Sequence, residues 1–110
     1  GYEMLEACGF DTENARRASA ALVRGNVENV IVSGCVQALT GPIERGDLVT
    51  VEKHLQVIPA QGKETYMALA REQIRLAKKK NPHRDYTDME CLLADEKRRR
   101  QNNEEYGRNI

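Results

Sequence analysis

Apolar residues recur every three or four positions along most of the chain, a spacing that places them on one face of a helix. Tyr2, Leu5 and Cys8 follow this spacing at the N-terminus, and Gly9 then supplies a stop that tolerates left-handed geometry. Residues 1–8 are therefore predicted to be the end of a helix. No run of residues alternates apolar and polar positions, so the pattern predicts no β-strand.

A second, longer helix is predicted from Asp11, whose side chain can cap its first turn, to about Ser33. Gly25 lies inside this run and costs about 1 kcal/mol relative to alanine, so either the helix bends there or a neighbour packs against its backbone. Asn26, Asn29 and Ser33 form a polar stripe, which is either solvated surface or the lining of a polar cleft. The apolar stripe of the same helix consists of Ala20, Val23, Val27, Val30, Ile31 and Gly34.

Two more amphipathic helices are predicted, over residues 48–58 and 62–80, and they end at Pro59 and at Asn81-Pro82. The apolar face of the first consists of Leu48, Val51, Leu55 and Ile58. That of the second consists of Tyr66, Leu69, Ala70, Ile74 and Ala77. The predicted fold class is therefore all-α, as a multi-helix bundle.

The segment from residue 83 to residue 110 has a different composition. Met89, Leu92 and Leu93 are its compact apolar patch, and residues 88–106 fit a polar, charge-rich helix. The basic run at residues 97–100 is flanked by carboxylates, which is typical of a solvated helix face rather than a nucleic-acid site. We therefore divide the chain into a helical domain, residues 1–82, and a polar charged tail, residues 83–110, also expected to be helical.

The stretch between the second and third predicted helices contains the strongest candidate for a binding loop. Gly41-Pro42 breaks the helical pattern, Gly46 supplies a flexible corner, and Asp47 can cap the next helix. Arg45 could hold a carboxylate or phosphate through its planar guanidinium. The same residues also have a purely structural interpretation, as a breaker, a cap and an ion pair.

Composition and motif content exclude several classes of function. The 110 residues include 17 Lys+Arg and 17 Asp+Glu, and a chain with zero net charge creates no general field for nucleic acid. No apolar run is long enough to span a membrane, and no secretory signal is visible. Cys8, Cys35 and Cys91 are few and far apart, which fits reduced thiols in the cytoplasm. No ligand spacing indicates a metal site, and no phosphate-binding loop is present.

The loop also carries a family resemblance. Residues 37–47, followed by Thr50, Val51, His54 and Leu55, resemble the pattern A-L-T-G-P-I-x-R-G-D-x-x-T-V-x-x-H-L of the domain of unknown function 2520. Upstream, residues 22–29 resemble the L-x-R-G-x-x-x-N helix of that family. Downstream, residues 66–70 resemble its Y-x-A-L-A helix. Together the matching segments cover about residues 2–82.

The resemblance implies a role that spacing alone does not give. Domains of this kind form the C-terminal helical half of NAD(P)-dependent oxidoreductases, behind a Rossmann-like domain that binds the cofactor. They are similar to the C-terminal domains of 6-phosphogluconate dehydrogenase, ketopantoate reductase and pyrroline-5-carboxylate reductase relatives, which form a dimer interface and close the substrate cleft. The implied partners are a second copy and the Rossmann-like domain, not nucleic acid or a membrane.

Matching residue by residue gives the candidate positions. The resemblance implies a substrate cleft lined by Asn29, Thr40, Gly41, Arg45 and His54. Arg45 would bind an acidic substrate group or hold the loop to Asp47. From the amphipathic pattern alone, His54 has two interpretations, a boundary residue of its helix, which is the more common case, or a base. Pro42, Gly46 and Asp47 would shape the loop.

The chain also departs from the family pattern. The Rossmann-like half has no counterpart among these residues, and we expect the helix that matches residues 2–9 to be a shortened form of the family's opening helix. We therefore expect the chain to bind no NAD(P) and to have no catalytic activity by itself. The alternative is a non-enzymatic helical interaction module, in which residues 88–106 bind a partner.

Overall fold

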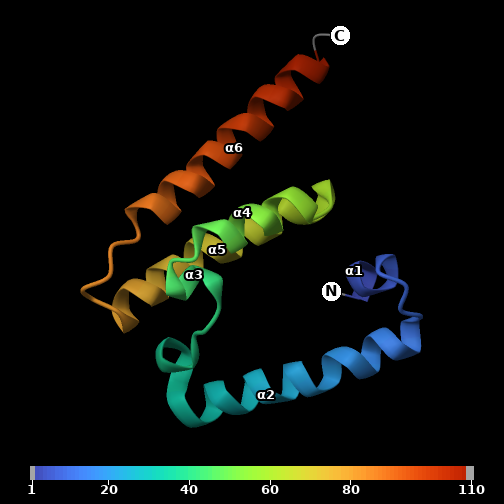
Figure 1. Ribbon diagram of the computed structural model, residues 1–110, viewed down its shortest axis with the longest axis vertical. Helices are drawn as coiled ribbons and strands as arrows, with labels where there is room; N and C mark the ends of the chain where they lie inside the picture. The colour runs from blue at the N-terminus through green and yellow to red at the C-terminus, as the bar shows by residue number, and fades with distance from the viewer. Residues whose placement is uncertain (1, 109–110) are drawn as a thin grey trace. The chain divides into compact units, whose positions relative to one another are not determined.

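The computed structural model describes residues 2–108, and all of its regular structure is helical (Figure 1). The prediction of an all-α fold is confirmed, and none of these residues forms a strand. The helices are α1 (Tyr2–Ala7), α2 (Thr12–Ala38), α3 (Pro42–Arg45), α4 (Leu48–Val57), α5 (Ala60–Lys80) and α6 (Thr87–Arg108). No helix in this part of the chain is long and apolar enough to cross a membrane.

The chain forms two compact units, which we describe separately: unit 1 (Gly1–Ala38) and unit 2 (Leu39–Ile110). In unit 1, α1 packs against α2, and Asp11 accepts a 2.7 Å hydrogen bond from the backbone N–H of Asn14 in the first turn of α2. The regular helix is interrupted at Gly34, whose φ of 80° lies outside the helical region. This interruption coincides with the end predicted near Ser33.

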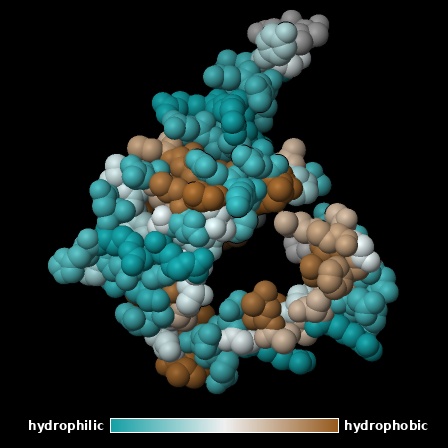
Figure 2. Space-filling model, in the orientation of Figure 1, coloured by the Kyte–Doolittle hydropathy of each residue, from teal (hydrophilic) through white to brown (hydrophobic). Residues whose placement is uncertain are grey.

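Most of the apolar stripe of α2 lacks a partner within unit 1. Ala15 is buried, but the larger apolar side chains further along the helix are between 42% and 73% exposed. They are Leu22, Val23, Val27, Val30, Ile31 and Val32. The helical spacing places four of them, Val23, Val27, Val30 and Ile31, on one side of the helix, which we call the α2 apolar face. Figure 2 shows separate hydrophobic patches, in brown, on this helix among more hydrophilic residues.

Unit 2 has its own hydrophobic core. α3 packs against α4 and α5, and α6 packs against the same two helices (Figure 1). The spacing of Met67, Ala70, Ile74 and Ala77 places one face of α5 in this core. Leu69 was expected on that face but is 58% exposed, because the buried row runs through Met67 instead. The core consists of Ile43, Val51, Leu55, Met67, Ala70, Ile74, Ala77, Tyr86, Met89 and Leu93.

The segment that composition sets apart as a polar tail supplies part of this core. Tyr86, Met89 and Leu93 are each no more than 2% exposed. Glu96 is also buried on α6, where its carboxylate pairs with Lys63 at 3.3 Å and with Arg99. Residues 87–108 are therefore an integral helix of unit 2, while the domain division at residue 82 stays a prediction.

Candidate functional site

The candidate site is built on the segment between α2 and α4, residues 39–47, which we call the α3 loop. Pro42 is the first residue of α3, where a missing N–H leaves no helical hydrogen bond unmade. Gly46 ends this short helix with a left-handed φ of 72°, a conformation that side-chain-bearing residues rarely adopt. The sequence thus forms a short helical turn that Pro42 begins and Gly46 ends.

Asp47 joins this loop to α4. Its carboxylate accepts hydrogen bonds from the backbone N–H of Thr50 at 3.1 Å and from the Thr50 hydroxyl at 2.7 Å. These hydrogen bonds, with a smaller contribution from the charge of Arg45, hold the pKa of Asp47 below its ordinary value. Asp47 is therefore an ionised N-cap whose position fixes the start of α4.

Glu44 is the centre of a hydrogen-bond network that fastens the α3 loop to the junction of α5 and α6. Its backbone carbonyl oxygen accepts from the Tyr86 hydroxyl at 2.6 Å and from the Arg84 guanidinium at 2.8 Å. Its carboxylate accepts from the side-chain amide of Asn81 at 2.9 Å and lies 3.8 Å from the Lys80 ammonium. The backbone carbonyl and the side-chain carboxylate of Glu44 thus both accept hydrogen bonds from residues that lie far away in sequence.

Lys80 adds a second attachment point, because its ammonium donates a 2.6 Å hydrogen bond to the backbone carbonyl oxygen of Leu39. Asn81 also donates to the Tyr86 hydroxyl at 3.0 Å, which closes the network. Sequence reasoning missed these residues, since Lys80 fits a basic helix end and Tyr86 falls in the presumed tail. The one available signal was a tyrosine isolated in an otherwise polar segment.

The predicted cleft residues of the loop have different surroundings. Thr40 and Arg45 are exposed, and Gly41 is half-buried. Among residues 2–108, no ion pair includes Arg45, so its guanidinium is not locked onto Asp47 at ion-pair distance. The loop therefore presents a hydroxyl and a cation to solvent from a fixed backbone.

His54 lies in the last turn of α4 and contacts α5. A 3.1 Å hydrogen bond joins its Nδ1 to the Tyr66 hydroxyl, and the two rings meet edge to face with centroids 6.0 Å apart. Burial raises the pKa of Tyr66. The resemblance implied His54 but not Tyr66 as a cleft residue, although the two act as one hydrogen-bonded pair across the helices.

Asn29 lies in the middle of α2, is exposed, and belongs to unit 1, whereas the other candidates belong to unit 2. Its place in a common cleft with Thr40 and Arg45 stays a prediction.

The described residues do not fit NAD(P). A dinucleotide site needs a glycine-rich turn from a strand into a helix, so that backbone N–H groups can bind the pyrophosphate. Residues 2–108 contain no strand, and Gly41 and Gly46 flank a short helix between two other helices. The described residues therefore supply no such turn, and the polar groups that the α3 loop exposes are the Thr40 hydroxyl and the Arg45 guanidinium.

A protein-family model described as "Domain of unknown function (DUF2520)" matches residues 1–73. The match contains unit 1, the α3 loop, α4 and the pair of His54 and Tyr66. It ends inside α5, before Lys80 and before the whole of α6. No curated protein and no solved structure matches the chain.

Proposed function

Because the chain belongs to the family of the domain of unknown function (DUF2520), we propose that it is the dimerisation and substrate-cleft domain of an NAD(P)-dependent oxidoreductase. In this proposal a separate Rossmann-like domain supplies the cofactor, and residues 1–110 are not catalytic by themselves. The setting is the cytoplasm, where the exposed thiols of Cys8, Cys35 and Cys91 stay reduced.

The observation that carries the proposal is the α2 apolar face. The four large aliphatic side chains of this face are exposed, while the partner of this helix within unit 1 is the six-residue α1. Burial of each such side chain is worth about 1.5–3 kcal/mol. A second copy of α2, related by two-fold symmetry, can cover the face with an identical one.

The α3 loop supports the substrate-cleft part. Specific recognition needs polar groups whose positions are fixed before the ligand arrives. The network around Glu44 fixes the backbone of the loop, and Arg45 and Thr40 remain exposed on it. The planar guanidinium of Arg45 is suited to bind a carboxylate or phosphate group of the substrate.

Analytical ultracentrifugation of the full chain tests the dimerisation half through matched variants. Val27→Glu and Ile31→Glu place a charge on the α2 apolar face, and each is expected to convert a dimer into a monomer. Val49→Glu is the control, because Val49 is 61% exposed but lies on α4 of unit 2. Equal sedimentation of all three variants and the unmodified chain would contradict the proposal.

The substrate-cleft half has its own test. Small carboxylates and phosphates are titrated into the isotope-labelled chain, and amide shifts of the α3 loop are followed by NMR. Arg45→Gln is expected to remove the shifts without changing the fold, since the side chain is exposed. Arg16→Gln on α2 is the matched control. Loop shifts that survive Arg45→Gln would exclude this residue as the anion-binding group.

The interaction-module alternative uses α6, whose buried face contributes to the core of unit 2. Its test must therefore use exposed residues of that helix rather than deletion of the segment. Partner capture that depends on exposed residues of α6, in a chain that stays monomeric, would favour this alternative.

A further inference from the structure

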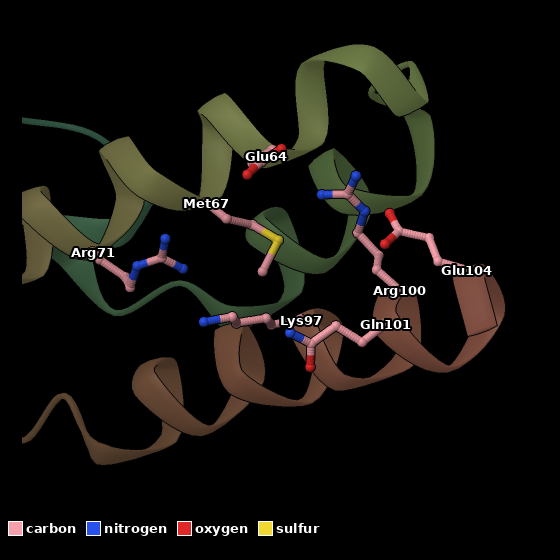
Figure 3. A pocket seen from close by; sticks show the side chains of 7 residues that line it. All are labelled: Glu64, Met67, Arg71, Lys97, Arg100, Gln101 and Glu104. Atoms are coloured by element: carbon pink, nitrogen blue, oxygen red, sulfur yellow. The ribbon is translucent and has the colours of Figure 1, made fainter.

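α5 and α6 enclose a groove that the proposed function does not use. It consists of two adjoining depressions, of about 470 Å³ and about 220 Å³, which share Arg71 and Lys97 in their linings. Figure 3 shows the smaller depression, in which the Lys97 side chain extends from α6 toward Arg71 on α5. We call the two together the α5–α6 groove. α6, which forms one wall, and the part of α5 beyond residue 73 lie outside the segment that the family model matches.

The floor of the larger depression is apolar. Ile74 from α5 and Leu93 and Ala94 from α6 line it, and the first two also belong to the core of unit 2. The aliphatic stems of the surrounding arginine and lysine side chains extend this apolar surface toward the rim. Its volume lies within the range of about 300–1,000 Å³ that small-molecule sites occupy.

The rim of the larger depression is mostly cationic, and its cations fall into two groups. Arg75 is paired with Glu72 at 2.5 Å, and Lys78 is paired with Glu90 at 2.5 Å. Arg71 and Lys97 differ, because no ion pair among residues 2–108 includes either of them. Two like charges from facing helices thus border the same apolar floor, and neither is held in an ion pair by another described residue.

The smaller depression has a mixed charge. Glu64 and Glu104 line it together with Arg71, Lys97 and Arg100. An anion is therefore favoured at the shared boundary and toward the larger depression, where Glu90 is the one lining carboxylate and is already paired with Lys78.

We propose that the α5–α6 groove binds an anionic amphiphile, a hydrocarbon chain that ends in a carboxylate or phosphate. Its headgroup lies between Arg71 and Lys97, where both cations donate charge-assisted hydrogen bonds. Its chain lies over Ile74, Leu93 and Ala94, and the apolar surface that it removes from water belongs mainly to Ala94 and to the aliphatic stems of the rim side chains, since Ile74 and Leu93 are already buried. The inference is independent of the proposed function, since it uses neither the α2 apolar face nor the α3 loop.

The test is a titration of the isotope-labelled full chain with decanoate and with decyl phosphate, each below its micelle concentration. Saturable amide shifts in residues 71–78 and 90–97 are expected for both ligands. The double variant Arg71→Gln with Lys97→Gln should weaken binding at least tenfold, which corresponds to about 1.4 kcal/mol. Both side chains are exposed, so the variant should keep the helical circular dichroism of the unmodified chain.

Arg98→Gln is the matched control, because Arg98 is the neighbour of Lys97 on α6 but pairs with Asp95 and does not line the groove. It should bind decanoate as the unmodified chain does. Equal binding of the uncharged decyl glucoside, or of inorganic phosphate alone, would overturn the amphiphile assignment. Unchanged affinity in the double variant would also overturn it, as would the absence of saturable shifts. Binding of an acidic helical peptide in place of decanoate would overturn it as well.

Discussion

The hydroxyl of Tyr86 donates a 2.6 Å hydrogen bond to the backbone carbonyl oxygen of Glu44, which lies 42 residues earlier in the chain. Together with the hydrogen bond from Arg84 to the same oxygen, this contact joins the segment that leads into α6 to the loop that carries the family motif. The motif therefore depends for its position on residues that the family model does not include.

Tyr86→Phe removes this hydrogen bond and leaves the ring in the core. We expect the free energy of unfolding to fall by about 1 kcal/mol, measured by urea denaturation of the full chain. Tyr106→Phe is the matched control, because Tyr106 is 71% exposed, and its effect should stay within about 0.5 kcal/mol. Equal effects of the two substitutions would argue against a structural role for the contact.

Truncation after Pro82 should unfold unit 2 rather than release a tail. It removes Met89 and Leu93, and loss of a buried side chain of this size costs about 2–5 kcal/mol. Small domains have a total stability of about 5–15 kcal/mol. Cooperative thermal unfolding followed by circular dichroism should disappear.

Truncation after Gln101 is the control for that experiment. Residues 102–108 are exposed, so their loss should leave a cooperative transition. A chain ending at Pro82 that unfolds as cooperatively as the one ending at Gln101 would show that α6 is dispensable.

Two glycines of α2 should respond to alanine in opposite directions. A Cβ at Gly25 meets no atom within 4 Å and the backbone there is helical, so Gly25→Ala should stabilise the chain by about 1 kcal/mol. Gly34 has a φ of 80°, so Gly34→Ala should be destabilising by about 1–2 kcal/mol. Denaturant midpoints measure both, and effects of the same sign would contradict the interruption of α2 at Gly34.

Asp47 should make stability depend on pH in the acid range. Its pKa is lower in the folded chain than in the unfolded chain, so its contribution is present above the ordinary aspartate pKa of about 3.9. That contribution is lost as the pH falls through the lower, folded pKa. Asp47→Asn keeps a capping oxygen but does not titrate, so the difference in melting temperature between it and the unmodified chain should shrink below pH 4. A constant difference down to pH 2 would exclude this linkage.

Local patterns predicted most of the fold, because they depend on neighbours in sequence. The spacing of Val51 and Leu55 and the cap at Asp47 fix α4 without reference to the rest of the chain. The prediction placed Leu69 rather than Met67 in the core of α5. Spacing could have made this choice too, because Met67 lies on the same helical row as Ala70, Ile74 and Ala77, whereas Leu69 lies off it.

The role of the candidate site residues in a cleft stays a prediction, and the structure shows only where they lie. Arg45 and Thr40 follow from the motif, and both lie exposed on the α3 loop. The anchoring of the loop by Lys80 and Tyr86 carries no local signal, because their acceptors lie 41 and 42 residues earlier. Tyr66 likewise carries no local signal of its role, because it contacts His54 only when α4 and α5 come together in the fold.

Multi-angle light scattering of the unmodified full chain tests the central claim most directly. If the α2 apolar face is a dimer interface, the molar mass should be twice that of one chain at micromolar concentration and should fall toward one chain on dilution. A molar mass of one chain at every concentration up to about a hundred micromolar, for a folded sample, would contradict the account.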